Sequence, residues 1–115
     1  MQAGIVIYRR HGNQLVGQWS HADEPIGGML ANEIVHDVAP NALEGDWPVE
    51  IFAPPAPGGP IYFTGRLRAS KLGDCVKLVW EGTFVKDGAP ARFEGIGLAS
   101  GPDLLSATFE KIEPR

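Results

Sequence analysis

Residues 12–28, GNQLVGQWSHADEPIGG, contain the pattern from which the fold of this chain is inferred. In an extended chain Leu15 and Trp19 fall on one side, whereas Gln18 and Ser20 fall on the other. Such a side-chain period of two is typical of a β-strand that buries one face. A Pro and two Gly residues follow, and these residue types favour a turn. The stretch therefore predicts one strand of an antiparallel sheet, followed by a turn.

The same alternation recurs along the chain, whereas apolar residues at helical spacing are almost absent. The 15 Gly and 10 Pro residues fall mostly between apolar runs, where they separate strands. Eight strands are predicted, at residues 4–9, 14–21, 29–36, 48–53, 61–69, 75–85, 91–99 and 104–112. We therefore expect an all-β fold, an eight-stranded antiparallel up-and-down barrel, although a split β-sandwich would bury the same faces.

Two segments at opposite ends of the chain are similar to each other. Residues 4–19 and 95–109 each begin with Gly, pass through a turn that contains Gly, and end in a second strand with large residues at alternate positions. If these two hairpins lie side by side, the sheet closes on itself and leaves no exposed edge. Gly65, Gly95 and Gly97 fit a closed barrel, because Gly on an inner face permits a sharp bend.

Length, charge and cysteine content exclude several classes of protein. At 115 residues the chain is expected to form one domain, residues 1–115. Its net charge of −4 argues against nucleic-acid binding, which needs a basic surface. The single cysteine, Cys75, cannot form an intrachain disulfide. No apolar run is long enough for a membrane helix or a signal peptide, so we expect a cytoplasmic protein without a membrane partner.

Gly17 and Trp19 also carry a resemblance to a known group of proteins. A Gly-x-Trp motif on an early strand, within a chain of about eight antiparallel strands, resembles the calycins, which include the lipocalins, fatty-acid-binding proteins and avidins. This resemblance implies a barrel of the lipocalin or streptavidin type that holds a small apolar ligand, or biotin, in its interior. Lipocalins carry the motif on the first strand, whereas here it lies on the second, and the biotin-binding residues cannot be placed. The hairpins also resemble those of small bacterial barrel proteins.

Aromatic and aliphatic residues on the predicted inner faces are candidates for the lining of an interior cavity. They are Trp19, Phe63, Leu78, Trp80 and Phe109. A barrel of about eight strands is either just filled by side chains or holds one small ligand. Our first hypothesis is therefore a small soluble barrel that binds an apolar or aromatic ligand in its interior and needs no cofactor.

Three polar residues are further candidates for this interior. Alternation places His21 on the face of Trp19, at the end of its strand, where it would lie at the barrel mouth. Either Asn32 or Glu33 faces inward, and the alternation does not decide between them. A buried Glu33 would have a raised pKa, so Glu33 or His21 would be the base of a cofactor-free isomerase or cyclase. No ligand spacing typical of zinc is present, and we expect no metal.

A third alternative is a filled barrel that acts through assembly. Several apolar residues would form an outer surface that water does not favour if they face outward: Leu30, Ile34, Val79, Ile96 and Leu98. Such a surface usually marks an interface, and a two-fold homodimer is its simplest use. A homodimer is compatible with all three hypotheses.

Overall fold

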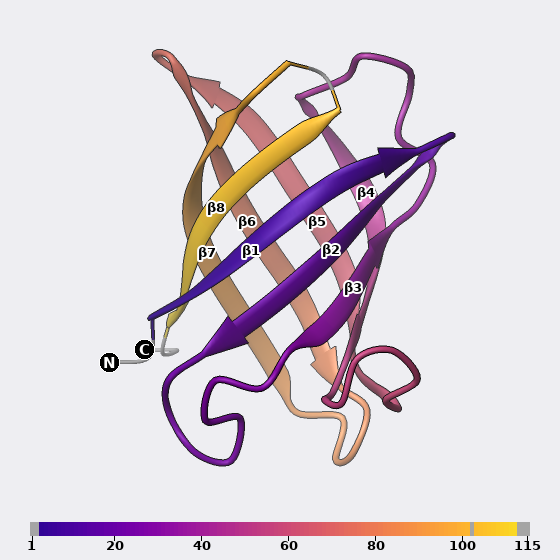
Figure 1. The fold of residues 1–115 in the computed structure, drawn as a ribbon, viewed down its shortest axis with the longest axis vertical. Coiled ribbons are helices and arrows are strands. Elements are labelled where there is room, and N and C mark those ends of the chain that lie inside the picture. The colour runs from indigo at the N-terminus through magenta and orange to yellow at the C-terminus, as the bar shows by residue number, and fades with distance from the viewer. Residues whose placement is uncertain (1–2, 102, 113–115) are drawn as a thin grey trace.

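The chain folds into a closed antiparallel β-barrel (Figure 1). The computed structural model describes residues 3–101 and 103–112. Its strands are β1 (Ala3–His11), β2 (Gln14–His21), β3 (Ala31–Val35), β4 (Gly45–Phe52), β5 (Ile61–Leu72), β6 (Cys75–Phe84), β7 (Pro90–Ala99) and β8 (Leu104–Ile112). The predicted eight-stranded up-and-down barrel is confirmed, and the described residues contain no helix. The predicted domain of residues 1–115 also includes residues 1–2, 102 and 113–115, which lie outside these ranges.

The two terminal strands close the barrel. β1 pairs with β8 along its length, from Ala3 opposite Glu110 to Arg9 opposite Leu104. Since β1 also pairs with β2 and β8 with β7, the two terminal hairpins lie side by side, as predicted. Closure satisfies the backbone hydrogen-bonding groups that the two strands would otherwise expose.

β3 is shorter than the strand predicted at residues 29–36, because loop contacts engage the residues before it. It begins at Ala31 and ends at Val35. The carbonyl oxygen of Met29 accepts a hydrogen bond from Oγ of Ser20, and that of Leu30 accepts one from the amide of Ala56. These bonds hold Met29 and Leu30 in the loops at the end of the barrel and outside the ladder.

β4 starts earlier than predicted, at Gly45, and it contains a proline. The carbonyl oxygen of Pro48 accepts a hydrogen bond from the amide of His36. In an antiparallel strand the amide and the carbonyl of one residue point to the same side. The missing N–H of Pro48 therefore faces the end of β3, where the ladder stops at the pair of Val35 and Val49. Its absence removes only the reciprocal bond to the carbonyl of His36, which lies beyond the last residue of β3.

Glycines on the inner face allow neighbouring strands to approach closely. Gly65 of β5 and Gly82 of β6 are register partners. A Cβ atom on either residue would lie 2.1 Å from a backbone carbonyl oxygen of the opposite strand. At Gly95 of β7 a Cβ atom would lie 1.9 Å from the carbonyl oxygen of Thr108 in β8. Only Gly fits at these positions unless the backbone moves.

One end of the barrel lies at the top of Figure 1, and we call it the closed end because a loop covers it and side chains fill it. The β3–β4 loop folds over it, with Val38 fully buried and its amide bonded to the carbonyl of Asn13. The guanidinium of Arg10 donates hydrogen bonds to the carbonyl oxygens of Ala39 and Ala42. Buried side chains pack this half of the interior, among them Leu15, Val35, Trp47, Leu67, Leu78 and Leu105.

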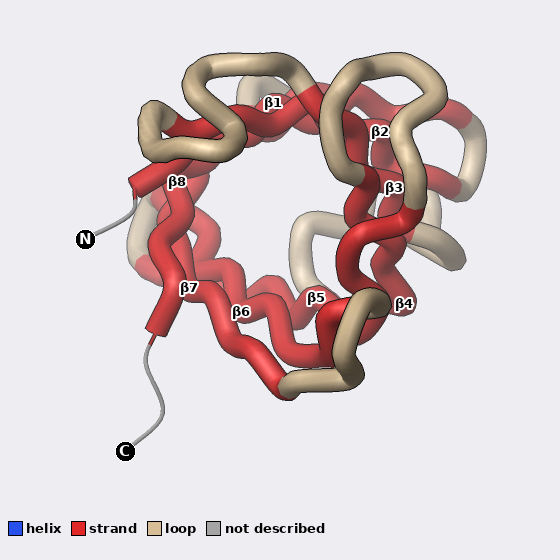
Figure 2. The backbone as a smooth tube through the Cα atoms, turned by 90° about the horizontal axis from the view of Figure 1, so that it is seen from below, coloured by secondary structure: helices blue, strands red, loops and turns tan. Residues whose placement is uncertain are grey.

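The opposite end carries the first residues of β1 and the last residues of β8. Three loops surround it, at residues 22–30, 53–60 and 85–89. It lies at the bottom in Figure 1, and Figure 2 shows the barrel from this side. We call it the open end.

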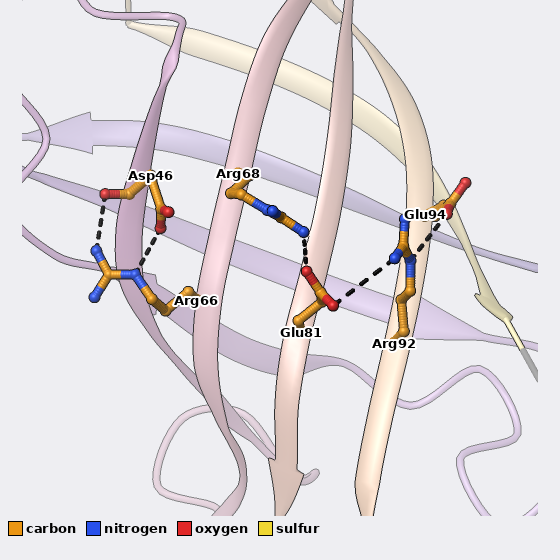
Figure 3. Close-up of polar contacts among 6 residues, drawn as sticks. All are labelled: Asp46, Arg66, Arg68, Glu81, Arg92 and Glu94. Carbon is orange, nitrogen blue, oxygen red and sulfur yellow. Dashed lines mark hydrogen bonds and ion pairs between the residues drawn. The ribbon is translucent and has the colours of Figure 1, made fainter. Parts of the chain in front are cut away.

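Ion pairs lie on the outer face of β4, β5, β6 and β7, and all but one of them connect neighbouring strands (Figure 3). The pairs are Arg66 with Asp46, Arg68 with Glu81, and Arg92 with both Glu81 and Glu94. This part of the outer surface is therefore charged on every strand, with opposite charges side by side.

The outer face of β1, β8 and β7 is uncharged at its centre. Ile5 and Ile96 are both register partners of Thr108 in β8. Ile5 is 60 % exposed and Leu98 is 63 % exposed. Of the residues predicted to face outward, Leu30, Ile96 and Leu98 are exposed, Ile34 is half-buried, and Val79 is buried. Among the described residues no helical segment could cross a lipid bilayer.

Candidate ligand site

A cavity of about 410 Å³ occupies the half of the barrel next to the open end. We call it the cup. Its lining consists of Trp19, His21, Glu33, Ile51, Tyr62, Phe63, Trp80, Phe84, Lys86, Asp87, Phe93, Phe109 and Lys111. All strands except β1 contribute a side chain to it. The packed closed end lies beneath the cup, and the loops of the open end surround its mouth.

Aromatic rings form most of the wall of the cup. The ring centroid of Phe109 lies 6.1 Å from that of Trp80, and 6.2 Å from those of Trp19 and Phe93. Phe63 lies 5.7 Å from Phe93. These contacts are edge-to-face, the arrangement that the charge distribution of aromatic rings favours. Each ring is thus held by its neighbours, and the wall is both apolar and well packed.

The floor of the cup carries a buried carboxyl group. Glu33 of β3 lines the cavity and is only 3 % exposed. Its Oε2 accepts one hydrogen bond from the hydroxyl of Tyr8 and another, of 3.0 Å, from Nε1 of Trp80. No other hydrogen bond or ion pair from the described residues reaches the side chain of Glu33. Because both bonds end on Oε2, the protein leaves Oε1 for the cup.

A glycine allows Tyr8 to reach Glu33. In the register Tyr8 pairs with Gly17, and Gly17 pairs on its other side with Glu33. A Cβ atom at position 17 would lie 2.9 Å from two ring carbons of Tyr8, closer than packed side chains tolerate. The ring of Tyr8 therefore lies across Gly17, and its hydroxyl extends to β3. This contact accounts for the Gly of the Gly-x-Trp motif in this chain.

Burial raises the pKa of Glu33 to about 7, although the hydrogen bonds from Tyr8 and Trp80 act to lower it. Desolvation outweighs these bonds because a charged carboxylate loses its hydration inside the barrel. Burial, together with the neighbouring Glu33, raises the pKa of Tyr8. Tyr8 therefore stays protonated and donates its hydrogen bond at neutral pH. The carboxyl group of Glu33, in contrast, gains or loses its proton near neutral pH.

Charged and polar side chains surround the mouth of the cup. Lys86 and Asp87 lie in the loop after β6, and Lys111 lies near the end of β8. The ammonium nitrogen of Lys111 is 5.5 Å from the ring centroid of Phe84, within the range of a cation–π contact. His21 lies beside Trp19, and its buried Nδ1 has no hydrogen-bond partner among the described residues.

Tyr62 lines the cup because the ladder between β4 and β5 is irregular. Strict alternation would place its side chain on the outer face, opposite to that of Phe63. The register shifts here, so that Ile51 pairs with Phe63, whereas Phe52 pairs with Ile61. Tyr62 is the extra residue in this step, and such a bulge can turn a side chain toward a site. Burial raises the pKa of its hydroxyl.

The structure brings six of the sequence-predicted ligand residues together in the cup: Trp19, His21, Glu33, Phe63, Trp80 and Phe109. Asn32 does not line the cup, and its side-chain amide donates a hydrogen bond of 3.3 Å to the carbonyl of Gly17. Leu78 is fully buried in the packed core and also lies outside the lining. Of the two alternatives in β3, Glu33 is therefore the inward residue.

Sequence reasoning missed the other lining residues and Tyr8 beneath the floor. The missed lining residues are Ile51, Tyr62, Phe84, Lys86, Asp87, Phe93 and Lys111. Alternation could have identified several of these positions. Tyr8 shares the inner face of β1 with Val6, and Phe84 shares that of β6 with Trp80. Lys86 lies in a loop, where side-chain direction follows no period.

The described part of the chain holds no group of three or more His, Cys, Asp or Glu side chains that could bind a metal ion. In comparisons with known proteins, no family model, no curated protein and no solved structure matches this chain. The chemistry of the cup is therefore inferred from its own geometry.

Proposed function

We propose that this protein binds a small aromatic or apolar molecule inside the cup. The observation that carries the proposal is an aromatic-walled cavity of about 410 Å³ with one buried carboxyl group at its floor. Small-molecule sites are typically cavities of roughly 300–1,000 Å³ with mostly apolar walls and a few polar groups that orient the ligand. The resemblance of Gly17 and Trp19 to the calycin motif supports the same function, and we infer a calycin-like barrel.

Tryptophan fluorescence provides a direct test. The chain contains three Trp residues; Trp19 and Trp80 line the cup, whereas Trp47 is buried in the packed core. The variant Trp47→Phe therefore reports on the cup alone. Titration of this variant with indole, naphthalene derivatives and medium-chain fatty acids should quench or shift its emission with at least one compound. If none of these compounds changes the emission of the folded variant, the proposed function is wrong.

A matched pair of variants locates the binding site. Phe93→Ala removes part of the wall of the cup, whereas Leu98→Ala removes an exposed side chain of similar size from the same strand. Ligand affinity should fall about tenfold or more in Phe93→Ala, because a lost aromatic contact costs roughly 1–3 kcal/mol. Leu98→Ala should bind as tightly as the unmodified protein. Equal affinities in both variants would place the ligand elsewhere.

Proton transfer inside the cup is a second candidate function, and the ionisation of Glu33 favours it. A general acid or base works best when its pKa lies near the operating pH, and that of Glu33 is about 7. A cofactor-free isomerase would use Glu33 as its base. Phenylacetone in deuterated water is a suitable probe, because exchange of its α-protons is visible by nuclear magnetic resonance (NMR). Faster exchange that Glu33→Gln abolishes supports this candidate, whereas equal rates in both proteins argue against it.

The uncharged centre of the outer face of β1, β7 and β8 favours a second copy of the chain as a partner. Two copies of such a face can pack against each other without charge repulsion, and exposed apolar patches usually mark interfaces. Light scattering at micromolar concentration should then show a dimer, and Leu98→Lys should convert it into a monomer. A monomer at all concentrations would contradict this proposal. A cytoplasmic location stays a prediction from the sequence.

A further inference from the structure

We propose that the ligand of the cup is an organic cation, a protonated amine on an aromatic or apolar body, whose N–H group binds Oε1 of Glu33. This inference rests on the proposed binding function and names the chemical class of its ligand. It follows from the hydrogen bonds at the floor, the charge balance of the buried site, and the cation that the aromatic wall already holds.

When Glu33 is ionised, the hydrogen bonds at the floor favour a ligand that donates. Tyr8 and Trp80 both donate to Oε2 of Glu33, so these two contacts leave Oε1 with its acceptor sites. An ionised carboxylate has only acceptors to offer. A ligand that reaches Oε1 with another acceptor would lose the hydration of both groups and gain no hydrogen bond. A ligand with an N–H group satisfies the open oxygen.

The charge balance at the floor favours a positive group whenever Glu33 is ionised. An ionised carboxylate in a buried site is stable when it is paired, and no described cation forms an ion pair with Glu33. The other titratable groups that line the cup are His21, Tyr62, Lys86, Asp87 and Lys111. Of these, Lys86 and Asp87 are exposed to water in the loop at the mouth, so their charges are screened. A ligand ammonium would supply the missing charge at the floor.

The wall of the cup is suited to a cation. Ring faces attract a positive charge, most strongly those of Trp. The structure contains one such contact, since the Lys111 ammonium lies 5.5 Å from the centre of the Phe84 ring. Trp80 both donates to Glu33 and lines the cavity, so an ammonium at Oε1 would lie next to its indole ring. The net charge of −4 also attracts cations to the protein.

Two probes of equal size test the inference. 2-Phenylethylamine and n-propylbenzene have the same number of non-hydrogen atoms and differ by one ammonium group. Calorimetric titration at pH 7.5 should show that the amine binds about tenfold more tightly or better, the effect of a charge-assisted hydrogen bond in a buried site. Equal affinity, or tighter binding of propylbenzene, would overturn the inference and leave the proposed function intact.

The variant Glu33→Gln identifies the residue responsible. The single amide oxygen of Gln can accept from both Tyr8 and Trp80, so the floor keeps its structure while Oε1 is replaced by a donor. The amine should then lose its advantage, whereas the affinity of propylbenzene should not change. Glu24→Gln is the matched control, because Glu24 is exposed in the loop before β3 and its removal changes the net charge equally. A similar loss of amine binding in both variants would overturn the inference.

A second measurement keeps the inference testable if Glu33→Gln does not fold. In the unmodified protein, saturation with 2-phenylethylamine should shift the carboxyl ¹³C resonance of Glu33 to its ionised position at pH 6.5, and propylbenzene should not. No change with the amine would overturn the inference. If neither probe binds, the inference is wrong, but the proposed function is wrong only if the wider panel of indole, naphthalene derivatives and fatty acids also fails to bind.

Discussion

The ring of Tyr8 lies across Gly17, and this contact positions the polar floor of the cup. A Cβ atom at position 17 would lie 2.9 Å from the ring carbons Cδ1 and Cε1 of Tyr8. The hydroxyl of Tyr8 can therefore reach Glu33, the partner of Gly17 on the other side of β2. Because Gly17 has no side chain, Tyr8 of β1 can extend across β2 and donate a hydrogen bond to Glu33 of β3.

Gly17→Ala should lower the free energy of unfolding by about 1–3 kcal/mol, because overpacking displaces the Tyr8 ring. Urea unfolding followed by tryptophan fluorescence measures this change. Gln18→Ala is the control, since Gln18 is the next residue of β2 and is exposed on the outer face. The two variants should differ clearly in their unfolding midpoints; equal midpoints would mean that Tyr8 does not need Gly17.

The stability of the protein should fall as the pH rises from about 4.5 to about 7. The pKa of Glu33 is about 7 in the folded protein and has an ordinary value of 4.5. Between these values the folded state binds more protons than the unfolded state, so raising the pH favours unfolding. The total loss is about 3 kcal/mol, and it levels off above the folded pKa.

Chemical unfolding at a series of pH values tests this prediction. The Glu33→Gln variant has no ionisable group at position 33. Its free energy of unfolding should therefore not show the decrease with rising pH that Glu33 causes. The difference between the two proteins should grow across the pH window from 4.5 to 7. Parallel curves would show that Glu33 keeps an ordinary pKa in the folded protein.

Tyr8→Phe should raise the pKa of Glu33 above its value in the unmodified protein, because the Tyr8 hydrogen bond lowers that pKa. Loss of this buried hydrogen bond should also lower the free energy of unfolding by about 1–3 kcal/mol. An NMR titration of the Glu33 side-chain carboxyl carbon measures the pKa. Tyr62→Phe serves as the control, because Tyr62 forms no hydrogen bond with Glu33 among the described contacts. An unchanged Glu33 pKa in Tyr8→Phe would contradict the proposed floor geometry.

Arg66→Ala should change the free energy of unfolding by less than about 1 kcal/mol, although Arg66 binds Asp46 at 2.6 Å (Figure 3). Both side chains are about half exposed, so water and salt screen their attraction. Thermal unfolding at low and high salt is the relevant measurement. A loss of several kcal/mol would show that the outer ion pairs stabilise the barrel more than exposed pairs usually do.

The barrel follows from the order of side chains along the chain. Alternation places Trp19 and Trp80 on inner faces without reference to any other strand, because a β-strand turns successive side chains to opposite sides. Gly and Pro between the apolar runs predict the turns for an equally local reason. The similar terminal hairpins predict closure, because the sheet otherwise keeps two exposed edges.

The tertiary structure decided the contents of the cup. Alternation left Asn32 and Glu33 as equal alternatives, and Glu33 faces inward because the register with Gly17 brings it within reach of Tyr8. Tyr62 lines the cup because a bulge between β4 and β5 reverses its direction. Register and bulges depend on contacts between distant segments. In most strands the buried face is therefore determined by the local sequence. The face of β3, the direction of Tyr62 and the partners of each inner side chain are determined by the closed barrel.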